Sequence, residues 1–156
     1  MSRSSVRRAT GEWFTGTVEG LVTVYTAFPT QIPAAAFGPG PHGAVAVVRI
    51  AADSERRIAY GGEHDGRKET THTVELQIFH RSVSGDGEAA TDHLDTLLDS
   101  LRDRIRADRR FADASIFQAG EGQTPITGTY GEPKLNGSVI EQWCSLRFPV
   151  QEITQT

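Results

Sequence analysis

The sequence predicts an α+β fold in which a mainly antiparallel (mixed) sheet carries one long amphipathic helix and a short N-terminal helix packed on it. Residues 72–80 alternate between apolar and polar side chains, as a half-buried strand does. After a glycine turn, residues 86–107 repeat apolar side chains at spacings of three and four, as a helix with one buried face does. The other apolar runs are short and bounded by Gly or Pro, which favours strands.

The long helix is expected to supply much of the core. Its predicted buried stripe consists of Ala90, Leu94, Leu97, Leu98, Leu101 and Ile105. Ser84 or Asp86 can cap its start, and acidic residues early with arginines late complement the helix dipole. Since burying each large apolar side chain contributes about 1.5–3 kcal/mol, we expect Leu98→Asp to prevent folding.

Shorter elements are predicted on both sides of this unit. A helix is expected over 3–14, with Val6, Thr10, Trp13 and Phe14 near one face, and strands over 21–27 and 44–50. The run ADSERR after residue 50 predicts a turn, so that 56–60 pairs back as a hairpin. In the strand at 72–80, Phe79 interrupts the polar face and indicates packing there as well.

The C-terminal third predicts strands at 114–120 and 138–150, with a further strand inside a long loop at 121–137. Pro149 cannot donate a backbone hydrogen bond, so it predicts a sheet edge or the end of the strand. The glycine-rich segment 61–71 is expected to be an exposed, mobile loop. We interpret residues 1–156 as a single domain with extended loops near 61–71 and 121–137.

Composition excludes several classes of protein. No apolar run approaches the ~20 residues that a membrane span needs, and the N-terminus lacks the apolar core of a secretory signal. The single cysteine excludes an internal disulfide framework and fits a reducing compartment. The net charge of −4 argues against a dedicated nucleic-acid binder, although DNA could pass such a surface without sticking.

A search for catalytic residues finds no convincing site. His72 and His80 share one face of a strand but lie about 26 Å apart at strand rise, too far to share a metal ion. Glu63, His64 and Asp65 are contiguous, and contiguous residues rarely converge on one ion. Cys144 falls on the apolar side of its strand, as a core cysteine does. We therefore expect no catalytic, cofactor or metal site, and no enzyme activity.

The arginine pairs allow two interpretations, and so do the scattered aromatic residues. Arg7–Arg8, Arg56–Arg57 and Arg109–Arg110 fit DNA phosphates, or else solvated faces and salt bridges between subunits, which the acidic balance favours. Trp13, Phe37, Tyr130 and Trp143 fit either a protein interface or the core.

The order of elements resembles a known family. A short helix precedes LVTVYTAFPTQIP, a Gly/Pro loop and an apolar strand; then follow RRIAYGGEHDGRKETTHTVELQIFHRS, the Leu-rich helix, TGTYGEP and a final strand. This order resembles the tail terminator (tail-completion) proteins of long-tailed (siphovirus) phages, especially phages of actinobacterial hosts. The resemblance covers most of the chain and is strongest from Arg57 to Arg104.

The resemblance implies a non-enzymatic virion protein without a cofactor, made in the host cytoplasm and located at the tail–neck junction. It implies a homo-oligomeric ring, hexameric in the family, that caps the tail tube protein and meets the head–tail connector or stopper protein. DNA would pass through the lumen without sequence-specific binding, and no membrane is involved. Our expected interface residues are Glu63, Asp65, Arg67, Lys68, Arg109 and Arg110, and deleting 62–69 is expected to block assembly without unfolding the subunit.

Three other readings stay open. A neighbouring neck component, such as a head–tail stopper or connector, would share most of these features. A small hot-dog-like enzyme or ligand-binding dimer also wraps strands around one long helix, although its helix comes earlier in the chain. A generic cytosolic interaction module is the third.

Overall fold

The computed structural model describes residues 3–59, 66–107, 116–118 and 125–155. Two α-helices and one 3-10 turn accompany the strands in this part of the chain: α1 (Arg3–Phe14), η1 (Ala34–Phe37) and α2 (Gly87–Ala107). The strands are β1 (Leu21–Tyr25), β2 (His42–Ala59), β3 (Arg67–Ser82), β4 (Ile116–Gln118), β5 (Thr127–Tyr130), β6 (Lys134–Asn136) and β7 (Val139–Gln155).

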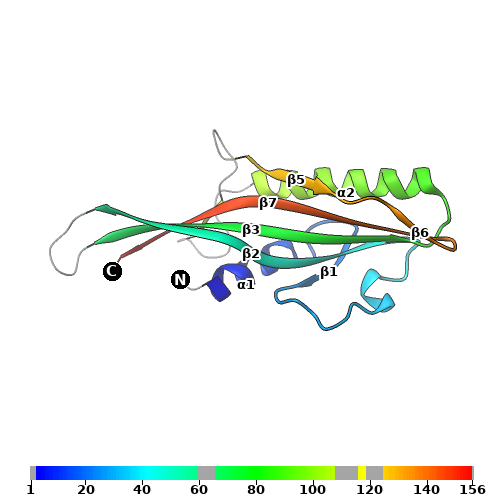
Figure 1. The fold of residues 1–156 in the computed structure, drawn as a ribbon, viewed down its shortest axis with the longest axis horizontal. Coiled ribbons are helices and arrows are strands. Elements are labelled where there is room, and N and C mark those ends of the chain that lie inside the picture. The colour runs from blue at the N-terminus through cyan, green and yellow to red at the C-terminus, as the bar shows by residue number, and fades with distance from the viewer. Residues whose placement is uncertain (1–2, 60–65, 108–115, 119–124, 156) are drawn as a thin grey trace.

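Three long antiparallel strands form the centre of one sheet (Figure 1). They are β2, β3 and β7, with 18, 16 and 17 residues. Strand β1 pairs with β2 in parallel at one edge, while β6, β5 and β4 pair in turn along the outer side of β7. The predicted α+β class with a mixed, mainly antiparallel sheet is therefore confirmed.

One face of this sheet packs against both helices and forms the core. The alternation of the three long strands turns an apolar residue toward the helices at every second position, from Ala44, Val74 and Cys144 onward. All six residues of the predicted helical stripe are buried there. Phe14 of α1 meets Phe148 edge to face, with ring centroids 6.2 Å apart. The two helices thus close one side of the sheet.

A side-chain cap begins α2, as predicted, and a glycine follows the end of α1. Asp86, rather than Ser84, caps α2: its Oδ1 accepts hydrogen bonds from the backbone N–H groups of Glu88 and Ala89, each at 3.1 Å. Helix α1 stops before Gly16, which adopts a φ of 68° that favours glycine. Neither helix in the described ranges is long and apolar enough to span a membrane.

The predicted turn at ADSERR is wrong, and so is the hairpin built on it. Strand β2 continues through these residues to Ala59 and pairs with β3 almost residue for residue, with irregularities between Ile50 and Ala52 and between Arg57 and Ala59. The polar run stays extended because its backbone N–H and C=O groups form hydrogen bonds with β3. Oppositely charged side chains also face each other across the two strands. Residues 67–71 of the predicted glycine-rich loop likewise belong to β3, whereas 60–65 lie outside the described residues.

The C-terminal strand is also longer than the sequence predicts. Strand β7 runs past Pro149 to Gln155, so Pro149 neither ends it nor lies on an outer strand of the sheet. On its outer side, β5 pairs with residues 144–147 and β4 with residues 150–152. Pro149 falls between these two ladders, where no described strand needs its missing N–H. The predicted strand within 121–137 is confirmed as β5, and the strand at 114–120 is described as the three residues of β4.

Candidate protein interface

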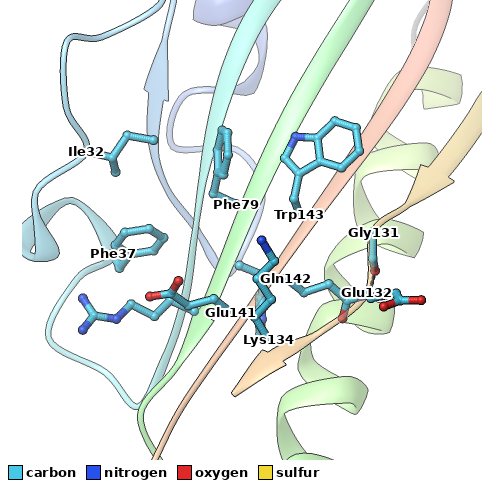
Figure 2. A pocket seen from close by; sticks show the side chains of 11 residues that line it. Ile32, Phe37, Phe79, Gly131, Glu132, Lys134, Glu141, Gln142 and Trp143 are labelled. Atoms are coloured by element: carbon cyan, nitrogen blue, oxygen red, sulfur yellow. Dashed lines mark hydrogen bonds between the residues drawn. The ribbon is translucent and has the colours of Figure 1, made fainter. Parts of the chain in front are cut away.

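The sheet face opposite α2 carries an open groove of about 820 Å³ (Figure 2). Ile32 and Phe37 from the β1–β2 connection form one wall, and Gly131, Glu132 and Lys134 form the other. Its floor includes Phe79 of β3 and Trp143 of β7, which are directly opposite each other in the ladder. The interruption of the polar face at Phe79 therefore has a structural reason: an aromatic surface lies there.

Charged side chains surround the aromatic floor. The guanidinium carbon of Arg81 lies 5.8 Å from the Phe37 ring centroid, within cation–π range. Arg81, Glu141 and Lys134 are consecutive partners across β3, β7 and β6. Trp143 remains 38% exposed. Aromatic residues and arginines on an accessible, partly apolar surface are typical of protein interfaces.

Beside the groove, the same face carries a network of charged residues around Glu75. This carboxylate is only 3% exposed and accepts hydrogen bonds from Arg147 Nε at 2.6 Å and from Gln77 Nε2 at 2.9 Å. The Arg49 guanidinium lies 3.5 Å from its other side. Two arginines thus neutralise one buried acid and hold β2, β3 and β7 together on the face without helices.

Beyond the helices, the far ends of β2, β3 and β7 form an arm (Figure 1). We define the arm as residues 53–59, 67–71 and 151–155. On β2, residues 53–57 are exposed, and the pairs Arg56–Glu69 and Lys68–Glu55 bridge the strands at 3.2 Å each. Such exposed pairs contribute little to stability, about 0–1 kcal/mol each.

Three histidines gather at the other end of the sheet, on the core side. His42, His80 and His93 come from β2, β3 and α2, and their ring centroids are 5.0–6.5 Å apart. His80 Nε2 and His93 Nδ1 share a hydrogen bond of 2.8 Å, and His42 Nδ1 bonds the Ser82 hydroxyl at 2.8 Å. Burial first, then the neighbouring His93 and His42, lower the pKa of His80 to about 4. Burial is also the main cause that lowers the pKa of His93.

Three further titratable groups are enclosed in the core. His72 Nε2 lies 3.4 Å from Glu152 Oε2, in a buried pair far from the histidine cluster. Cys144 is fully buried, and burial raises the pKa of its thiol to about 11. A thiol held protonated in this way is a core residue and a poor nucleophile, as predicted. Among the residues described, no group of His, Cys, Asp or Glu is arranged to hold a metal ion.

Two of the six predicted interface residues, Arg67 and Lys68, lie within the described part of the chain. Lys68 lies on the arm, where it pairs with Glu55. Arg67 begins β3. Glu63, Asp65, Arg109 and Arg110 lie outside the described residues, as does His64. The groove and the histidine cluster were not predicted as sites. Phe79, an aromatic residue on the polar side of its strand, was the sequence feature that indicated the groove. The histidines of the cluster come from three different elements, so their spacing along the chain does not indicate that they meet.

Comparison with known proteins gives weak structural similarity and no match in sequence. No family model and no curated protein matches the chain. Among solved structures, it is similar to a chain described as "Virion of native gene transfer agent (GTA) particle", at 11% sequence identity and a TM-score of 0.37 over 94% of each chain. A similarity of this size assigns neither family nor function.

Proposed function

We propose that this protein is a virion structural protein of a tailed-phage-like particle. In the proposal it is a tail terminator that assembles as a ring on the last ring of the tail tube, stops tube growth and joins the tube to the neck. The observation that carries the proposal is the three-stranded arm, which extends the sheet well past the part covered by the helices (Figure 1).

The arm is difficult to explain in a protein that works alone. Ordering each residue costs roughly 1–2 kcal/mol of backbone entropy, and burial of apolar side chains normally offsets this cost. On β2, the arm residues 53–57 are exposed and four of the five are charged. An extended polar ladder of this kind is suited to contacts with other chains, as in a ring whose neighbours the arm can reach.

Exposed apolar side chains support the same reading. Large apolar side chains remain exposed at several separate places, including Phe28 at 72% and Leu135 at 74%. Together with the aromatic groove, they provide more than one apolar patch on one subunit. A ring requires two different patches per subunit, because each copy contacts its two neighbours through unlike surfaces.

The partners of the proposed ring follow from the family that the sequence resembles. They are the tail tube protein on one side and the connector or stopper of the neck on the other, with DNA passing through the lumen. A net charge of −4 suits a channel that does not retain DNA. The protein would act by binding and geometry alone, without catalysis or a cofactor.

Electron microscopy of the purified protein mixed with tail tube protein tests the proposal. We expect rings of sixfold symmetry at tube ends and shorter tubes of controlled length when the protein is present. A compact dimer that binds a small acyl ligand and leaves tube growth unchanged would overturn the assignment. Binding to the head connector but not to tube ends would instead identify a neighbouring neck component.

A further inference from the structure

We infer that the first half of α2, residues 87–97, is a pH-sensitive latch that separates from the sheet in acid while the rest of the fold stays closed. The inference concerns the single subunit and does not depend on the proposed ring. The histidine cluster, His42, His80 and His93, connects this half of the helix to the ends of β2 and β3. Opening of the latch uncovers Cys144, the one cysteine of the chain.

The contact between His80 and His93 accommodates one added proton but not two. His80 Nε2 and His93 Nδ1 share a hydrogen bond of 2.8 Å, in which one ring donates its N–H and the other accepts with a lone pair. One added proton leaves an acceptor in the pair. A second proton sets two N–H groups against each other at this distance, so the two rings must separate when both are charged.

The surroundings of this pair disfavour its charged forms. Burial, followed by the neighbouring His93 and His42, lowers the pKa of His80 to about 4. Burial and then His42 also lower the pKa of His93, against the opposing charge of Glu19 in the connection between α1 and β1. Opposite His80 in the ladder, β7 contributes the neutral Gln142. Protons therefore bind more readily to an arrangement in which water reaches the two rings.

The two halves of α2 are held to the rest of the fold unequally. In the second half, Arg102 donates to the Tyr130 hydroxyl, and Arg104 donates to the Trp13 carbonyl with its guanidinium 4.0 Å from the centroid of the indole ring. In the first half, the described residues show one side-chain hydrogen bond to the sheet, the bond of His93 to β3. A helix shorter than about 12–15 residues is marginal on its own, so a detached first half also unwinds.

Cys144 provides a natural reporter of this opening. Its side chain is fully buried in the core cluster that also contains Leu94 and Leu98 of α2. Burial first, and then the charge of Asp95 in α2, raise the pKa of the thiol to about 11. The thiol therefore lies beneath the first half of the helix. A reagent reaches it when that half moves away or when the whole protein unfolds.

The experiment measures how fast a dithiodipyridine reagent, which still reacts in acid, modifies Cys144. Dividing this rate by the rate for urea-unfolded protein at the same pH gives the accessible fraction of the thiol. Between pH 7.5 and 4.5 this fraction should rise by about 70-fold, because His80 has a pKa of about 4 in the closed state and 6.5 in the open one.

Three variants show whether the cluster causes this rise. His80→Gln removes the titrating group and should abolish most of the rise. His93→Gln, at a half-buried position, removes the other ring of the pair and should also reduce it. His72→Gln is the matched control, since His72 is a buried histidine of the same strand outside the cluster, and it should keep the full rise.

The urea dependence of the same rate at pH 4.5 separates local opening from global unfolding. Because the slope of free energy against urea scales with the surface exposed, opening of the latch should give less than about half the slope measured for global unfolding by circular dichroism. Equal slopes would overturn the inference, since the thiol would then be exposed by unfolding of the whole protein. An equal rise with acid in the wild type, His80→Gln and His93→Gln would overturn it as well.

Discussion

Acid should destabilise the fold through His80. This side chain is 3% exposed and lies between α2 and the sheet, in contact with His93 and near His42. Because burial lowers its pKa from 6.5 to about 4, it is neutral in the folded protein over a range in which the unfolded chain binds a proton. The stabilisation is fully present above pH 6.5 and is lost as the pH falls toward 4.

The magnitude follows from the two pKa values. A difference of about 2.5 between 6.5 and 4 corresponds to about 3 kcal/mol at 1.36 kcal/mol for each pKa unit, and about 2.5 kcal/mol of it is lost between pH 7.5 and 4.5. For a chain of this size, 1 kcal/mol shifts the melting temperature by roughly 2–4 °C, so His80 accounts for a decrease of about 5–10 °C. His93 acts in the same direction, since burial lowers its pKa too.

The assay compares thermal unfolding of the wild type and His80→Gln by circular dichroism at both pH values. Glutamine removes the titration and retains a donor for His93 Nδ1. The pH-dependent decrease in melting temperature should shrink by about 5–10 °C in the variant, because every other titrating group is shared. An equal decrease in both proteins, or an NMR titration that places the His80 pKa near 6.5, would refute the reasoning.

Two substitutions and one deletion test the core, the open face and the arm. Leu98→Asp buries an unpaired carboxylate in the helix–sheet core and should cost more than about 4 kcal/mol, leaving insoluble or unfolded protein; a soluble variant with an unchanged urea midpoint would contradict the core assignment. Glu75→Gln removes the charge between two half-exposed arginines and should cost about 1–2 kcal/mol in urea unfolding, whereas the exposed Glu132→Gln should cost under about 0.5. Removing 55–70 and joining the flanking residues by an Asn-Gly turn should leave the melting temperature within a few degrees but abolish tube capping in electron microscopy; normal capping would remove the arm from the proposed mechanism.

Local patterns predicted those parts of the fold that local chemistry determines. The α2 stripe follows from the helical period, and Asp86 caps α2 with its own neighbours, so both can be read from a short window. The arm could not be read in this way. Residues 52–57 look like a turn in isolation. They stay extended because β3 pairs with them and is itself paired with β7, which lies about 80 residues beyond β3 in the chain.

The candidate site, like the arm, depends on contacts between segments that are far apart in the sequence. Phe79 was recognised as unusual, but the groove also needs Ile32, Phe37 and Trp143, and only the register of β3 with β7 sets Trp143 beside Phe79. The spacing of eight residues between His72 and His80 on one strand predicts that the two side chains lie apart, as they do in β3. The same spacing does not indicate that β2 and α2 each bring a histidine to His80.

We expect one face of the sheet to determine the stability of the subunit and the other face to determine its assembly. On the core face, Leu98 and its neighbours pack the helices against the strands. Substitutions there should therefore lower the free energy of unfolding more than they affect assembly. On the open face, Trp143 and Glu132 are exposed, so substitutions there should change assembly at constant stability. His80 belongs to the core face, because its imidazole bonds His93 of α2. Acid should therefore weaken the fold through His80, whereas Glu132→Gln on the open face should leave the stability nearly unchanged.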